Sequence, residues 1–238
     1  MQSNFKTQTN HVMTSEKEES GNLDITETLG KTELFIEKNQ KNLTIALGVI
    51  VLVVGGYFGY KKFVLEPKEK EAQAQMFVAE RYFEMDSLKL AINGDGNYKG
   101  FEAIVSDYGM TKSANRAHYY LGMSYLKTGE YEKAIENLKN FSSDDEVLKP
   151  IAMGAIGDAY MEQGKMDEAA AQYKLAAEAK TNDFSSPIYL MKAGLAFEKA
   201  GKFDEAVAVY EKVKSDFPKS NEAANTDKFI ERAKASKK

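Results

Sequence analysis

The hydrophobic pattern of the chain is dominated by one uncharged run, Leu43 to Tyr60, which is almost entirely apolar. At a rise of ~1.5 Å per residue, an α-helix over this run is about 27 Å long, close to the ~30 Å hydrocarbon core of a bilayer. Aromatic rings and lysines gather at its C-terminal end, where such side chains favour the membrane interface. They are Tyr57, Phe58, Tyr60, Lys61, Lys62 and Phe63. The run therefore predicts a transmembrane helix, and a buried core helix is the alternative.

Two further features bear on this run. A cleaved signal peptide would start near the N-terminus and end at small residues, but 42 residues precede the run and no A-x-A site follows it. A retained anchor is therefore expected. Gly48, Gly55 and Gly59 share one helix face, and such spacing lets a second helix approach closely in lipid. We predict that these glycines bind a partner helix, although glycine is also generally frequent in membrane helices.

Downstream of the run, apolar positions recur at helical spacing and one motif occurs three times. Each copy has a glycine, an aromatic residue three positions later, a second glycine and then an alanine. The copies contain Gly122, Tyr125, Gly129 and Ala134; Gly157, Tyr160, Gly164 and Ala169; and Gly194, Phe197, Gly201 and Ala206. The first glycines are 35 and 37 residues apart (157 − 122 and 194 − 157).

This motif resembles the tetratricopeptide repeat, a helix–turn–helix unit of about 34 residues. The resemblance implies a role for each position. The first glycine lets the second helix of the repeat pack close to the first helix. The second glycine ends the first helix in a left-handed conformation. The alanine is the close-contact point on the second helix.

The whole pattern predicts an all-α fold class, with a single N-terminal transmembrane helix followed by a tetratricopeptide repeat α-solenoid and a C-terminal capping helix. Residues 68–91 have helical spacing, and residues 97–109 resemble the second helix of the third copy. The predicted segments are a disordered tail (1–30), a juxtamembrane segment with the transmembrane helix (31–66), a degenerate first repeat (67–112), three repeats (115–219), and a capping helix with a tail (220–238). A helix over 220–235 is expected because end repeats need a polar outer face.

Composition and motifs exclude several classes of function. The net charge is −4, so no basic surface for nucleic acid is indicated, and the absence of cysteine excludes disulfides and thiolate metal sites. The stretch from Asn93 to Asn97 begins like a calcium loop, but Tyr98 and Ile104 replace the glycine and glutamate that such a loop needs. A tight turn is expected there instead. His118 is expected to be a packing residue. We predict no enzyme, no cofactor and no metal site.

In the tetratricopeptide family, the first helix of each repeat lines the concave face of a superhelix. The resemblance therefore implies a partner-binding groove. Its predicted residues are Arg116, Tyr119, Met123, Lys127, Ile151, Asp158, Met161, Ile188, Met191 and Leu195. An apolar groove with several methionines suits varied apolar or helical ligands, because methionine adapts its shape. The alternative is that this surface packs on the chain's own terminal helices.

The segment around the anchor carries a narrower resemblance. Residues 34–43, LFIEKNQKNL, together with the glycines and tyrosines at 48, 55–57 and 59–60, closely resemble the start of the YfgM-like membrane proteins. In that family the tail is cytoplasmic, the tetratricopeptide domain is periplasmic, and the members associate with the SecYEG translocon and the membrane-anchored chaperone PpiD. The resemblance implies an ancillary translocon subunit of the bacterial inner membrane, without catalysis of its own, that also contacts lipid and emerging secretory chains.

Two alternatives to this role remain. A repeat scaffold for outer-membrane or cell-wall assembly would also be periplasmic. A cytoplasmic-side membrane adaptor is favoured by the positive-inside rule, because more basic residues follow the anchor than precede it. The residues concerned are Lys31, Lys38 and Lys41 before it, and Lys61, Lys62, Lys68, Lys70 and Arg81 after it.

Overall fold

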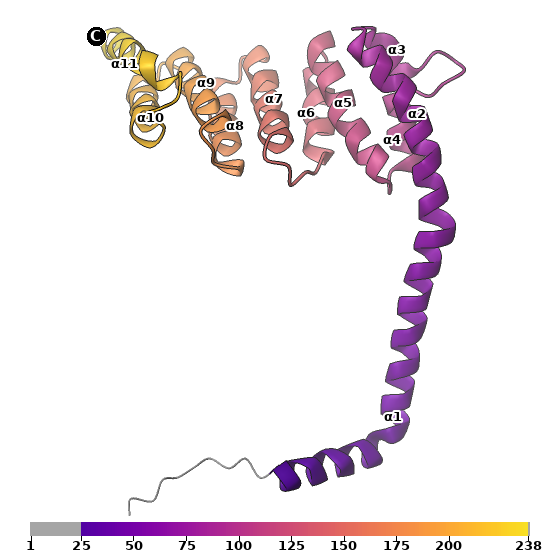
Figure 1. Ribbon diagram of the computed structural model, residues 1–238. Coiled ribbons are helices and arrows are strands. Elements are labelled where there is room, and N and C mark those ends of the chain that lie inside the picture. The colour runs from indigo at the N-terminus through magenta and orange to yellow at the C-terminus, as the bar shows by residue number, and fades with distance from the viewer. Residues whose placement is uncertain (1–24, 238) are drawn as a thin grey trace, which may run out of the picture. The chain divides into compact units, whose positions relative to one another are not determined.

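The computed structural model describes residues 25–237, with side chains from Glu33 onward, and this part of the chain contains helices and loops but no β-strand (Figure 1). The all-α prediction is therefore confirmed. The elements are α1 (Ile25–Tyr60), a π-helical turn (Lys61–Leu65), α2 (Glu66–Glu84), α3 (Leu88–Asn93), α4 (Phe101–Tyr108), α5 (Lys112–Thr128), α6 (Tyr131–Asn140), α7 (Leu148–Glu162), α8 (Met166–Ala179), α9 (Ser185–Lys199), α10 (Phe203–Asp216), a 3₁₀ turn (Ala223–Asn225) and α11 (Thr226–Ser236).

The chain divides into two units, which meet between Phe58 and Gly59. The described part of the first unit is helical and belongs to α1. One helical stretch, Glu33–Glu84, is long and apolar enough to cross a membrane, and its apolar window has no buried residue. An added Cβ at Gly48 or Gly55 would meet no atom within 4 Å, so these glycines leave open space beside the helix.

The second unit is a row of antiparallel helix pairs, α5–α6, α7–α8 and α9–α10, in which successive helices pack against each other (Figure 1). The close-contact alanines Ala134, Ala169 and Ala206 are completely buried. The pairs are tight because the first glycine of each copy sits under a large side chain of the following helix. An added Cβ at Gly157, for example, would lie 2.6 Å from the Tyr173 ring.

The second glycine of each copy ends its helix as the motif predicts. Gly129, Gly164 and Gly201 have φ angles of 82°, 75° and 75°. The backbone N–H of the residue after each glycine donates a hydrogen bond to a carbonyl oxygen of the preceding helix. One example is the hydrogen bond of 2.9 Å from the Lys202 N–H to the carbonyl oxygen of Phe197. Such left-handed positions favour glycine because a Cβ would crowd the backbone.

Three predicted boundaries differ from the structure. Residues 25–30, which were assigned to the disordered tail, lie in α1, while the remainder of that tail is outside the described residues. The expected helix over 68–91 is two helices, because the chain turns at Asp86, whose φ is 55°. The terminal helix begins at Thr226 and not near residue 220, since residues 217–225 form turns first.

Candidate partner-binding surface

The ten residues predicted to line the groove lie on three helices that contact one another in sequence, α5 with α7 and α7 with α9. Each is half-buried or exposed, and none is buried. We call these ten residues the A-helix surface. They are Arg116, Tyr119, Met123 and Lys127 on α5; Ile151, Asp158 and Met161 on α7; and Ile188, Met191 and Leu195 on α9.

The apolar members of this surface are anchored in the core on one side. Tyr119 packs its ring on Phe141, with a centroid separation of 5.3 Å, and both it and Met123 lie against the buried cluster that joins α6 to α7. Met161 and Met191 lie in the same way against the cluster of α8 and α9. Leu195 is the most open apolar member, with 37% of its surface exposed. The apolar part is therefore held in place and accessible.

The Asp158 carboxylate is held by hydrogen bonds from other residues of the chain, whereas its predicted role is to contact a partner. Its carboxylate accepts a hydrogen bond of 2.6 Å from the Tyr173 hydroxyl on α8 and one of 2.8 Å from the Lys192 ammonium on α9. Burial, followed by the hydrogen bond to Asp158, raises the pKa of Tyr173 far above its usual range, so this hydroxyl remains a donor. Asp158 thus joins α7 to α8 and α9.

A buried tyrosine missing from the predicted set completes this region. Tyr189 lies over Gly154, where an added Cβ would come within 2.0 Å of its ring. Burial, with the nearby charges of Asp158 and Tyr119, raises the pKa of Tyr189 to about 12. Gly154 precedes Asp158 by four residues and so shares its face of α7. Gly154 is outside the repeated motif, so its position four residues before Asp158 is the sequence signal for this contact.

At the N-terminal edge of the A-helix surface, Lys127 also interacts with other residues of the chain. Its ammonium forms an ion pair of 3.0 Å with Asp86 and lies 5.2 Å from the centre of the Phe83 ring. Both partners belong to the region predicted as a degenerate first repeat, so Lys127 ties that region to α5. Arg116 is exposed.

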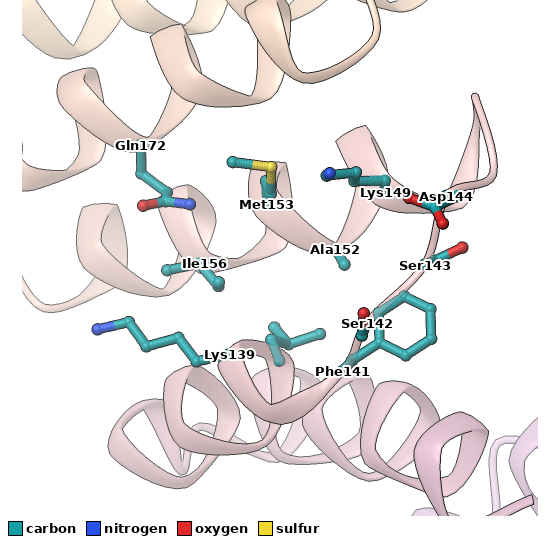
Figure 2. Close-up of a pocket in the computed structure, with 11 residues that line it drawn as sticks. Lys139, Phe141, Ser142, Ser143, Asp144, Lys149, Ala152, Met153, Ile156 and Gln172 are labelled. Atoms are coloured by element: carbon teal, nitrogen blue, oxygen red, sulfur yellow. The ribbon is translucent and has the colours of Figure 1, made fainter. Parts of the chain in front are cut away.

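A cavity of about 290 Å³ adjoins the surface between α6, α7 and α8 (Figure 2). Its apolar lining includes Ala152, Met153 and Ile156, and the Lys139 and Lys149 side chains lie on opposite sides of it (Figure 2). Phe141 also lines this cavity and contacts Tyr119, so the cavity and the A-helix surface share one aromatic pair.

The residues considered for other chemistry have structural roles. His118 Nδ1 lies 3.0 Å from the Asn137 amide oxygen, in line with a packing role. Asp95 accepts hydrogen bonds from the backbone N–H groups of Asn97 and Tyr98, which makes the tight turn expected there. Within residues 33–237, no three histidine or acidic side chains converge as a metal site would require.

The chain matches the tetratricopeptide repeat-like domain family over residues 35–231. Two solved structures of a Podosopora anserina protein, described as the nearly identical TPR-like repeats of a kinesin light chain, are similar in fold. Each is 17% identical and the match covers 71% of this chain and 87% of that one, with TM-scores of 0.54 and, for a glutamine-to-methionine variant, 0.53. No curated protein matches the chain.

Proposed function

The chain belongs to the tetratricopeptide repeat-like domain family, and we propose that it is a membrane-anchored interaction protein whose A-helix surface binds other proteins. Folds of this family are generally non-catalytic interaction modules. The observation that carries the proposal is the accessible apolar surface across α5, α7 and α9, in which the methionines are backed by packed core. Such a surface suits an apolar or helical ligand.

The proposed setting is the bacterial inner membrane, with a cytoplasmic N-terminus and periplasmic repeats. The unburied apolar window within Glu33–Glu84 supports an anchor. The open space beside Gly48 and Gly55 supports a helix partner in lipid. The resemblance of residues 34–60 to the YfgM-like proteins favours the SecYEG translocon and a PpiD-like chaperone as partners, with emerging secretory chains at the repeats.

Affinity purification from gently solubilised membranes tests this role. We expect SecY, SecE or SecG to co-purify with the full chain, and the translocon role is wrong if none does. Leu195→Glu on α9 places a charge on the A-helix surface and should reduce recovery of partners that bind the repeats. Leu175→Glu on α8 is the matched control, since Leu175 is 50% exposed but lies on the other helix of its pair.

An envelope-assembly scaffold is the second candidate, and it would co-purify outer-membrane or cell-wall assembly factors in the same experiment. A cytoplasmic adaptor is the third, favoured by the basic residues that follow the anchor. Protease added to intact spheroplasts separates these cases. Digestion of the repeats places them in the periplasm, whereas their protection eliminates both periplasmic roles.

A further inference from the structure

The two ends of the helical row in the second unit differ in polarity. At the C-terminal end, the exposed side chains of α11 are polar or small, including Asp227, Lys228 and Glu231. At the other end, Phe77 on α2 and Met85, which directly follows α2, have 68% and 63% of their surfaces accessible. Solenoids need polar outer faces at their ends to remain soluble. The exposed face of α2 is therefore the exception that calls for a cover.

Several side chains of α2, together with Met85 and Tyr98, which follow it in the chain, form one continuous surface that we call the α2 patch. It surrounds a hollow of about 560 Å³ and consists of Ala74, Phe77, Val78, Arg81, Tyr82, Met85 and Tyr98. By helical spacing this face is opposite Ala72, Met76 and Ala79, which are buried against the rest of the unit. The patch is thus a second apolar face on a helix whose first face already packs in the core.

The rim of the patch is held by hydrogen bonds. The Tyr82 hydroxyl donates to the Asp95 carboxylate at 2.8 Å, and the same carboxylate accepts from the backbone N–H of Tyr98 at 2.7 Å. Tyr98 is therefore fixed beside α2 although it comes from the loop after α3. Because the patch is already formed, a partner would not have to order it.

We propose that the α2 patch is the contact surface between two copies of this chain. In a two-fold contact each copy offers the same patch, so the patch must complement itself. Arg81 lies within it and forms no ion pair among residues 33–237, whereas the Asp95 carboxylate lies at its edge, where it accepts the hydrogen bond from Tyr82. A two-fold contact would therefore pair Arg81 of one copy with Asp95 of the other, so the charges of the patch complement themselves.

The composition and the position of the patch also favour a second copy. Aromatic residues, methionine and arginine are the side chains enriched at protein interfaces, and lysine is depleted there. The α2 patch has all three of the former and no lysine. Helix α2 begins six positions after Tyr60. Copies anchored in one membrane are confined to the same surface, which raises their effective concentration.

Cysteine cross-linking of the full chain in its native membrane tests the proposal. The chain has no cysteine, so each introduced thiol is the only one. Oxidation of Ala74→Cys or Val78→Cys should give a disulfide-linked product at twice the monomer mass of 26.5 kDa. Leu175→Cys is the control, because that exposed residue lies on α8 and away from the patch. It should give no such product while reacting equally well with a maleimide.

A second substitution distinguishes docking from random collision in the membrane. Phe77→Glu removes the most exposed ring of the patch and should slow the cross-linking of Ala74→Cys by about tenfold or more. The proposal is overturned if Phe77→Glu has no effect, if Leu175→Cys cross-links equally, or if the product has the mass of a different protein. None of these outcomes bears on the translocon role, which depends on the A-helix surface and the anchor.

Discussion

Replacing Gly157 with alanine should destabilise the repeats, although alanine is the better helix former. An added Cβ at this position in α7 would lie 2.6 Å from two atoms of the Tyr173 ring. Ordinary contacts of this kind are 3.4 Å or longer, so the ring must move. The ring cannot move freely, because the Tyr173 hydroxyl donates a hydrogen bond of 2.6 Å to Asp158, which lies on the same helix as Gly157.

The expected size of the effect is the difference between opposing contributions. Overpacking of a core costs about 1–3 kcal/mol, and a lost hydrogen bond to a charged group costs about 1.5–3 kcal/mol. The gain in helix propensity from glycine to alanine is about 1 kcal/mol. If the ring shifts and keeps its hydrogen bond, Gly157→Ala costs up to about 2 kcal/mol. If the hydrogen bond breaks, the cost is about 1.5–5 kcal/mol.

Urea unfolding of the full chain in detergent, followed by circular dichroism, measures this cost. Ala171→Gly, at an exposed position of α8, measures the propensity contribution in the same protein and should cost about 0.5–1 kcal/mol. In a Tyr173→Leu background the ring is absent, so Gly157→Ala should become neutral or stabilising. The reasoning is refuted if Gly157→Ala stabilises the protein while Tyr173 is present.

Three other predictions concern single side chains. Burial raises the pKa of Glu198, but hydrogen bonds from Arg232 and Tyr210 outweigh it and lower the pKa overall. The stabilisation from these hydrogen bonds is therefore fully present at pH values above the pKa of Glu198 in the unfolded chain. It is lost as the pH falls through the lower pKa of Glu198 in the folded protein. Glu198→Gln should therefore cost about 1–2 kcal/mol at pH 7, and urea titrations at falling pH should show this gap closing; a constant gap would contradict the assignment. Gly201→Ala should lower stability by roughly 1–2 kcal/mol, because φ is 75° there, and a thermal midpoint equal to wild type would argue against that strain. The ultraviolet difference between wild type and Tyr189→Phe should titrate at about 12, and a midpoint at ~10, the value of a free tyrosine, would mean that Tyr189 is not buried beside Asp158.

Much of the repeat architecture follows from the sequence because its constraints are local. Gly201 and its two counterparts end helices through their own backbone angles, and Gly157 meets a side chain at a fixed position in the next helix. The helix break at Asp86 was missed because apolar spacing continues through Leu88 and Ile92, and aspartate is only one of several residues that tolerate a left-handed angle. Periodicity alone does not reveal such a turn.

The partners of Asp158 were not predictable for a different reason. The position looked like a groove contact, but its carboxylate is held by Tyr173 and by Lys192, which are 15 and 34 residues away. These pairings depend on how one repeat stacks on the next. The motif fixes the positions of glycines, an aromatic residue and an alanine, and it does not specify which polar side chains meet. Lys127 is likewise tied to Asp86. Asp158 and Lys127 on the A-helix surface therefore bind other residues of the chain. The side chains that remain for a partner are mainly apolar, and Leu195 is the most exposed of these apolar side chains.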